Sequence, residues 1–235
     1  MTDAVLNITR SILGQPWRWR GLGADQRAGF EADDLVTQLL LSRGVAHAAL
    51  DQHRTPTIRG FMPDPSIFRD MDAAADRIVA AVTGGERVTI FGDYDVDGAT
   101  SAALLIRLLR GLGLDPQAYI PDRLMEGYGP SGEALVRIAQ GGAQLIVTVD
   151  CGAQAFEALD MAAGVGIDVI VVDHHQCASA LPRALALVNP NRLDEDEGAA
   201  HGHLAAVGVA FLLAAAILRT LRARDRKSTR LNSSH

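Results

Sequence analysis

Short apolar runs alternate with amphipathic segments along most of the chain. The apolar runs predict strands at residues 87–91, 117–120, 144–149, 167–172 and 184–188. Around them, apolar side chains recur at helical spacing in residues 70–82, 99–110, 131–140, 153–163 and 204–224. Strands that alternate with helices predict an α/β domain with a parallel sheet and right-handed crossovers.

The expected sheet has five parallel strands and is doubly wound, with the order 2-1-3-4-5. That order places the first, third and fourth strands side by side. Upstream, helical spacing predicts a helix over Glu31–Ser42, and Asp70 or Asp72 is expected to cap the helix that opens the domain. The prolines between 48 and 67 predict an extended connector. We therefore predict an N-terminal helical arm and connector at 1–69, followed by the α/β domain at 70–224.

Acidic residues and a histidine pair follow three of the predicted strands. These strand ends supply seven candidate side chains: Asp93, Asp95, Asp97, Asp150, Asp173, His174 and His175. The carboxyl ends of parallel strands meet at one edge of a sheet, so we expect these groups to lie together. Crowded carboxylates repel one another unless a cation neutralises them, and oxygen ligands suit Mg²⁺ or Mn²⁺. The pattern predicts a site for two divalent cations.

Other interpretations of these residues fit less well. A calcium-binding EF-hand loop that starts at Asp93 would need Glu at its twelfth position, where Leu104 stands. No glycine-rich phosphate-binding motif follows the first strand. Cys151 and Cys177 flank the acidic cluster, but they do not form the C-x-x-C pair typical of zinc sites. A solvated acidic turn and a loop histidine pair are the plain structural alternatives.

Composition limits the function classes. The 235 residues are 48% hydrophobic, which is enough for one good core. A net charge of −6 argues against a broad basic surface for nucleic acid. Two cysteines make no disulfide framework and favour a reducing cytoplasm. We expect no signal peptide in Met1–Arg20 and no membrane partner, since the apolar segment Leu204–Leu218 is short and favours a buried helix.

Several segments resemble motifs of the DHH phosphoesterases, and specifically of the RecJ single-stranded-DNA exonucleases. The first motif is Gly92-Asp93-Tyr94-Asp95-Val96-Asp97-Gly98, the second is Val147–Gly152, and the third is Val172–His175. The segments Glu126–Ser131 and Val188–Asn191 are also similar to RecJ sequences. The resemblance extends from about residue 68 to 218.

The resemblance implies roles for the carboxylates. Asp95 and Asp97 match the metal-binding carboxylates of the first motif. Smaller DHH enzymes carry a histidine at the position of Phe91, so Asp93 is expected to take over that metal contact here. Asp150 is the candidate that bridges both cations.

The third motif and one arginine complete the expected site. The resemblance makes His174 a metal ligand. His175 is expected to touch the scissile phosphate or to protonate the leaving oxygen, and Asp173 to orient a histidine. Arg123 is a candidate phosphate contact, and an ordinary surface arginine is its alternative.

The resemblance implies 5′–3′ hydrolysis of single-stranded DNA with Mn²⁺ or Mg²⁺, in recombination and repair. Single-stranded DNA, a single-strand-binding protein and a helicase are the implied partners. Two alternatives stay open: a DHH phosphodiesterase of short oligonucleotides or cyclic dinucleotides, and a catalytically silent nucleic-acid-binding module.

The resemblance also implies parts that the 235 residues do not contain. These are a fourth motif with another metal-binding Asp, a DHHA1 domain and an OB-like domain. Residues 225–235 are polar and aperiodic, and they resemble a sequencing-library adapter translated in frame. We therefore expect a non-native tail, a DHH domain that is incomplete at its C-terminus, and little or no hydrolysis by the chain as given.

Overall fold

The computed structural model describes residues 7–17 and 34–232, with side chains up to Asp225. The chain forms two units, Met1–Met62 and Pro63–His235. The division falls seven residues before the predicted end of the arm at 69. Residues 63–69 belong with the second unit because Phe68 is buried and the Arg69 N–H donates to the Glu195 carboxylate at 3.1 Å.

The first unit contains short helices. They are α2 (Leu35–Ser42), a 3₁₀ turn (His47–Ala49), α3 (Leu50–Arg54) and α4 (Ile58–Phe61). The predicted helix over Glu31–Ser42 is present as α2, and its residues 31–33 lie outside the described part of the chain. The prediction of an extended connector was wrong, because this stretch contains α3 and α4. Thr57 caps α4 by accepting the Gly60 N–H. Asp64 likewise caps a second 3₁₀ turn, Pro65–Ile67. Proline is the first residue of this turn, where its missing N–H costs no hydrogen bond.

A five-stranded sheet forms the centre of the second unit. Its strands are β1 (Val88–Gly92), β2 (Gln117–Tyr119), β3 (Leu145–Val149), β4 (Asp168–Val172) and β5 (Ala186–Val188). All neighbours are parallel in the order β2-β1-β3-β4-β5, which confirms the predicted fold class. Gly92, Val149 and Val172 are in register, so β1, β3 and β4 end at the same level.

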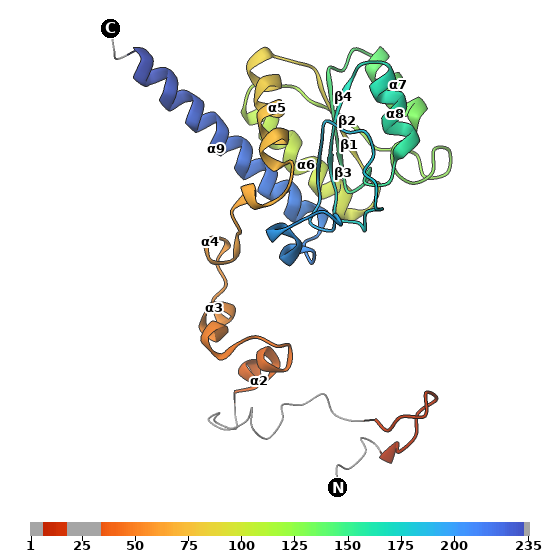
Figure 1. Ribbon diagram of the computed structural model, residues 1–235, viewed down its shortest axis with the longest axis vertical. Coiled ribbons are helices and arrows are strands. Elements are labelled where there is room, and N and C mark those ends of the chain that lie inside the picture. The colour runs from red at the N-terminus through yellow and green to blue at the C-terminus, as the bar shows by residue number, and fades with distance from the viewer. Residues whose placement is uncertain (1–6, 18–33, 233–235) are drawn as a thin grey trace. The chain divides into compact units, whose positions relative to one another are not determined.

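Helices cover both faces of the sheet (Figure 1). α5 (Met71–Gly84), α6 (Val96–Gly111) and α9 (Ala206–Asn232) pack on one face, and α7 (Gly132–Gln140) and α8 (Phe156–Gly164) pack on the other. β1 and β3 are buried at every position, as expected for central strands with helices on both sides. Ser131 caps α7 as predicted, accepting the Ala134 N–H at 3.2 Å.

α9 runs eight residues beyond the predicted helix end at Arg224. Its last part is rich in Arg, Lys and Leu, which favour helix, and neither Gly nor Pro interrupts it. That residues 225–235 are a non-native tail stays a prediction. Residues Ala206–Asp225 have the length and hydropathy of a membrane span, and 44% of that window is buried in the structure. Leu213 and Ile217 are fully buried and α9 packs on α5 and α6, as in the core helix of a globular domain.

Asp70 begins α5 in an unexpected way. It occupies the N-cap position, but its side chain makes no capping bond. Its backbone is left-handed, with φ of 61°, and its Oδ2 accepts the Leu187 N–H at 3.1 Å and an Arg192 N–H at 2.6 Å. The side chain of Asp70 therefore does not cap α5 but links the start of this helix to β5 through hydrogen bonds.

Candidate metal centre

The loop after β1 presents two carboxylates at the edge of the sheet. The Asp93 N–H donates to the Val149 carbonyl at 3.3 Å, which continues the β1–β3 ladder and buries the side chain to 3% exposure. Asp95 is the N-cap of α6, and its Oδ1 accepts the Gly98 N–H at 2.9 Å. α6 therefore begins at Val96, three residues before the predicted start at Ala99. A Cβ on Gly98 would lie 2.6 Å from the Asp93 carbonyl oxygen, so this tight turn requires glycine.

Asp97 connects the loop to the far end of the chain. Its Oδ2 accepts the Ala206 N–H at 2.8 Å, and its Oδ1 accepts the Val207 N–H at 2.9 Å. Both donors lie in the first turn of α9, where free N–H groups and the helix dipole favour a negative charge. α9 thus fixes the orientation of a predicted metal ligand. This contact could not be predicted from the sequence, because Asp97 and Ala206 are 109 residues apart.

Asp150 follows β3 directly and has a left-handed backbone conformation. Its N–H donates to the Val172 carbonyl at 2.9 Å, its φ is 62°, and its side chain is 1% exposed. Aspartate tolerates this backbone better than most residues. Gly152 has a φ of 111°, and a Cβ there would lie 2.8 Å from Thr148 Oγ1. The turn therefore fixes the carboxylate at the end of its strand.

Asp173 organises the histidine pair after β4. Its buried Oδ1 accepts the backbone N–H groups of His174 and His175 at 2.7 and 3.2 Å. The same atom lies 2.7 Å from His175 Nδ1, and Oδ2 accepts the Ala153 N–H at 2.9 Å. Since a carboxylate only accepts, His175 Nδ1 carries the proton and Nε2 is the ring atom that remains for other contacts.

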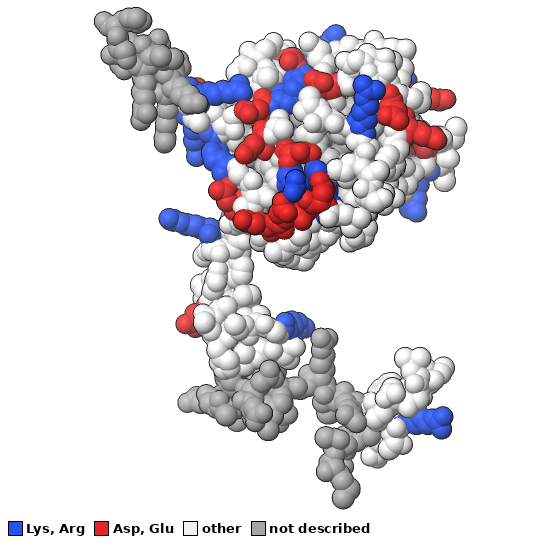
Figure 2. All heavy atoms as spheres, viewed as in Figure 1, with Lys and Arg blue, Asp and Glu red and all other residues white. Residues whose placement is uncertain are grey.

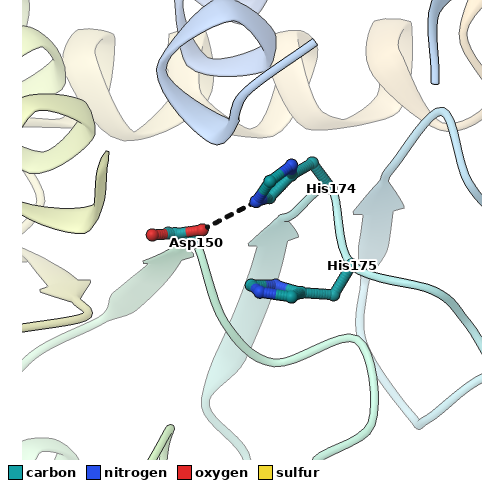
Figure 3. Close-up of side chains that lie close together, drawn as sticks. All are labelled: Asp150, His174 and His175. Carbon is teal, nitrogen blue, oxygen red and sulfur yellow. Dashed lines mark ion pairs between the residues drawn. The ribbon is translucent and has the colours of Figure 1, made fainter. Parts of the chain in front are cut away.

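The three strand ends converge on Asp150. Figure 3 shows the His174 ring directed at Asp150, with Nε2 at 3.3 Å from Oδ1. His174 Nε2 also lies 3.8 Å from Asp97 Oδ2. Ligand atoms come within 4.8 Å of one another in two groups, Asp93–Asp95–Asp150 and Asp150–His174–His175. Asp150 belongs to both groups, which is the geometry expected of a bridging carboxylate. Asp97 lies outside them, beside His174.

Two carboxylates of this cluster, Asp93 and Asp150, lie in an environment that disfavours their charged forms. Burial, together with the neighbouring Asp95 and Asp97, raises the pKa of Asp150 to about 8. Burial likewise raises the pKa of Asp93, whereas the Gly98 N–H lowers that of Asp95. One oxygen of Asp93 and one of Asp150 are buried without a hydrogen-bond partner among the described residues. Unpartnered buried carboxylate oxygens are costly, and a divalent cation would satisfy both. The donor set therefore fits Mn²⁺ or Mg²⁺.

A cavity adjoins the cluster on the side of His175. Its volume is about 320 Å³, and its lining includes Tyr128, Gly152, Gln154, Asp173 and His175. Burial raises the pKa of Tyr128, so its hydroxyl stays protonated, and it donates to the Asp150 carbonyl at 3.3 Å. The sequence placed Tyr128 in a motif but gave it no role.

Arg123 lies near the centre without joining it. It is exposed, its guanidinium lies 4.9 Å from the centroid of the Tyr94 ring, and its charge acts to lower the pKa of Asp93. Cys151 points elsewhere, with Sγ 3.4 Å from the Val149 carbonyl, and burial raises its pKa. No cysteine belongs to a metal-capable group in the described part of the chain, so the zinc alternative gains no support.

Comparisons with known proteins agree with this geometry. Residues 87–233 match the DHH family, N-terminal domain. The chain is 40% identical over 189 residues to the single-stranded-DNA-specific exonuclease RecJ of Bacillus subtilis (strain 168), covering 80% of this chain and 24% of that protein. It is 38% identical over 193 residues to RecJ of Escherichia coli (strain K12), covering 82% and 32%. The chain thus spans a quarter to a third of the length of these relatives.

Solved structures show the same similarity. A crystal structure of exonuclease RecJ bound to manganese matches 66% of this chain and 38% of its own, with 36% identity and a TM-score of 0.58. RecJ from Thermus thermophilus in complex with Mn²⁺ matches 66% of this chain and 21% of its own, with 32% identity and a TM-score of 0.55. Because the family match covers more than half of the residues and includes all three acidic strand ends, the chain belongs to the DHH family.

Proposed function

We propose that this chain carries the metal centre of an exonuclease that hydrolyses single-stranded DNA from the 5′ end with Mn²⁺ or Mg²⁺. The observation that carries the proposal is the convergence of β1, β3 and β4 on Asp150, which two metal-capable groups share. The similarity to RecJ proteins, two of them solved with manganese, supports the cation and the substrate. A role in recombination and repair, with a single-strand-binding protein and a helicase as partners in the cytoplasm, belongs to the same proposal.

The acidic residues and the two histidines of this chain have different proposed roles. Asp93, Asp95 and Asp150 would hold one cation. Asp150 and His174 would hold the other, with Asp97 beside His174 as a further carboxylate. Bound cations neutralise phosphate charge and activate the attacking water. The hydrogen bond to Asp173 raises the pKa of His175, with burial opposing it. The raised pKa favours the doubly protonated ring, whose Nε2 proton can pass to the leaving oxygen while Nδ1 stays bonded to Asp173.

The charge distribution supports DNA contacts at the cavity rather than over a broad surface. On the face of the second unit that Figure 2 shows, Lys and Arg side chains are interspersed with Asp and Glu. Arg123 lies close enough to Asp93 to influence its pKa, so it is the candidate contact for a phosphate group. The cavity beside His175 and Tyr128 then lies next to the bond that is cleaved.

Mn²⁺ binding is the first test, because it depends only on residues that the structure describes. We expect the chain to bind Mn²⁺ in an equilibrium titration followed by electron paramagnetic resonance, and the Asp150→Asn variant to lose most of this binding. The Asp160→Asn variant is the matched control, because Asp160 is exposed on α8 away from the cluster. A chain that binds no Mn²⁺, or an Asp150→Asn variant that binds it normally, would contradict the proposal.

Hydrolysis is the second test. Single-stranded DNA labelled at the 5′ or the 3′ end is incubated with a high concentration of the chain and Mn²⁺, and products are resolved on a gel. Any cleavage is expected to release mononucleotides from the 5′ end and to disappear in the Asp150→Asn variant. Faster cleavage of a dinucleotide than of a long strand would instead favour the small-substrate phosphodiesterase.

A further inference from the structure

The turn after β5, Asn189-Pro190-Asn191, lies directly behind the histidine pair. Asn189 is fully buried, and its Nδ2 donates to the His175 carbonyl at 2.9 Å. Its Oδ1 accepts the Asn191 N–H at 2.8 Å, which fixes the orientation of the amide. Both ends of a buried side chain are therefore used, one to shape the turn and the other to hold the main chain of His175.

Asn191 makes the corresponding contact with the preceding residue. Its Nδ2 donates to the His174 carbonyl at 2.5 Å and to the Gly202 carbonyl at 3.2 Å. The last ladder bond of β4 runs from the Asp173 N–H to the Val188 carbonyl. Beyond it, the carbonyls of His174 and His175 accept from the two Asn amides instead of a neighbouring strand.

The second contact of Asn191 links His174 to the turn that selects its tautomer. Two residues beyond Gly202, the Leu204 carbonyl lies 3.1 Å from His174 Nδ1. A carbonyl only accepts, so Nδ1 carries the proton and Nε2 keeps its lone pair. That lone pair is on the ring atom that lies 3.3 Å from Asp150 Oδ1. By binding both carbonyls, Asn191 fixes the main chain of His174 relative to the turn that orients its ring.

We propose that Asn189 and Asn191 are positioning residues of the metal centre, with Asn191 the more important. Their amides hold the main chain of the histidine pair so that the Leu204 carbonyl can direct His174 Nε2 at Asp150. The inference rests on the proposed function, because it presumes that His174 binds a cation. It adds two residues to the centre, neither of which touches the cation.

An amide-to-carboxylate change tests this role with little change in shape. Asn191→Asp replaces two N–H donors by an acceptor that faces the carbonyls of His174 and Gly202, which it repels. Residues that hydrogen-bond to metal ligands without touching the ion typically contribute about 10–100-fold in metal affinity. We expect Asn191→Asp to weaken Mn²⁺ binding by a factor of this size. Gln140→Glu is the matched control, since Gln140 is an exposed amide at the end of α7.

Two measurements separate positioning from general stability. The first is the dissociation constant for Mn²⁺ alone, and the second is the nitrogen modulation in the electron spin echo of bound Mn²⁺, which reports a coordinated imidazole. We expect Asn191→Asp to weaken binding and to reduce the imidazole signal, and Gln140→Glu to change neither. A folded Asn191→Asp variant with normal affinity and a normal imidazole signal would overturn the inference, whatever its unfolding temperature.

A second variant covers the case in which Asn191→Asp does not fold. Asn191→Ser removes the paired donors without adding charge, and the same two outcomes apply to it. The two proposals fail differently. If the unmodified chain binds no Mn²⁺, the proposed function and this inference both fall. If the unmodified chain binds Mn²⁺ and the Asn191 variants do so equally well, only this inference falls.

Discussion

Replacing Asp150 by Asn should stabilise the metal-free protein at neutral pH while it removes most of the metal binding. The carboxylate is 1% exposed and close to other acidic groups, and its pKa rises from 3.8 to about 8 on folding. Between these pH values the folded state holds a proton that the unfolded state has lost. The free energy of unfolding therefore falls as pH rises from about 4 to about 8, and it is highest below that window.

The magnitude follows from the shift. At pH 7 the solution is about 3 pH units above the unfolded-state pKa of 3.8, and each unit corresponds to about 1.4 kcal/mol. The raised pKa of Asp150 therefore lowers the free energy of unfolding at pH 7 by up to about 4 kcal/mol. Coupling with Asp95 and Asp97 makes this an upper limit, and we expect a gain of about 2–4 kcal/mol for Asp150→Asn at pH 7. A hydrogen bond with Asp95 contributes to the raised pKa of Asp150, and an amide N–H of asparagine can donate in its place. Asparagine also tolerates the left-handed backbone.

The assay is urea unfolding, followed by circular dichroism in EDTA at pH 5, 6, 7 and 8. The advantage of Asp150→Asn over the unmodified chain should grow with pH and should be at most about 1.6 kcal/mol at pH 5, which lies about 1.2 pH units above 3.8. Asp160→Asn serves as the control and should show no such trend. Added Mn²⁺ should stabilise the unmodified chain by about 2.7 kcal/mol at a hundred times its dissociation constant, and should stabilise Asp150→Asn far less. An Asp150→Asn variant that is less stable at pH 7, or whose difference is independent of pH, would refute this reasoning.

Four further substitutions test three separate features. Gly152→Ala should lower the free energy of unfolding by about 1–3 kcal/mol, because a Cβ meets Thr148 Oγ1 at 2.8 Å and the φ of 111° is strained; normal stability in urea would contradict this. Arg192→Ala should cost about 1–3 kcal/mol, because it removes the hydrogen bond to the Leu187 carbonyl and leaves two exposed carboxylates, Asp70 and Asp194, unpaired; a loss below about 0.5 kcal/mol in the same assay would count against a structural role. His174→Ala should weaken Mn²⁺ binding by at least about tenfold and His175→Ala far less, as measured by equilibrium titration, and the opposite ranking would exchange their roles.

The sheet could be predicted from the sequence because its signals are local. β1, β3 and β4 are apolar runs that end in acidic residues, and in a parallel sheet those ends must meet. The order β2-β1-β3-β4-β5 then follows from the need to bring Asp93, Asp150 and His174 together. The chemistry of the site was visible for the same reason, since each of its motifs is continuous in sequence.

Contacts between distant residues could not be predicted in this way. The sequence shows nothing that links Asp97 to Ala206 or Asp70 to Arg192, because these pairs form only after the helices have packed. The local capping rule correctly identified Ser131 but predicted the wrong bond for Asp70, whose left-handed backbone redirects its side chain. Asn191 belonged to a motif, yet its donors reach carbonyls 17 and 11 residues away.

The left-handed turn at Asp150 limits what this position can become. With a φ of 62°, only Gly, Asn and Asp fit without a penalty of about 1–2 kcal/mol. Of these three, aspartate alone brings a charge for a cation. Glutamate, often regarded as the mildest replacement, would be disfavoured both by its backbone preference and by its longer reach. In a library of all twenty residues at position 150, selection for folding at neutral pH without metal should therefore favour Gly and Asn, and selection for metal should retain only Asp.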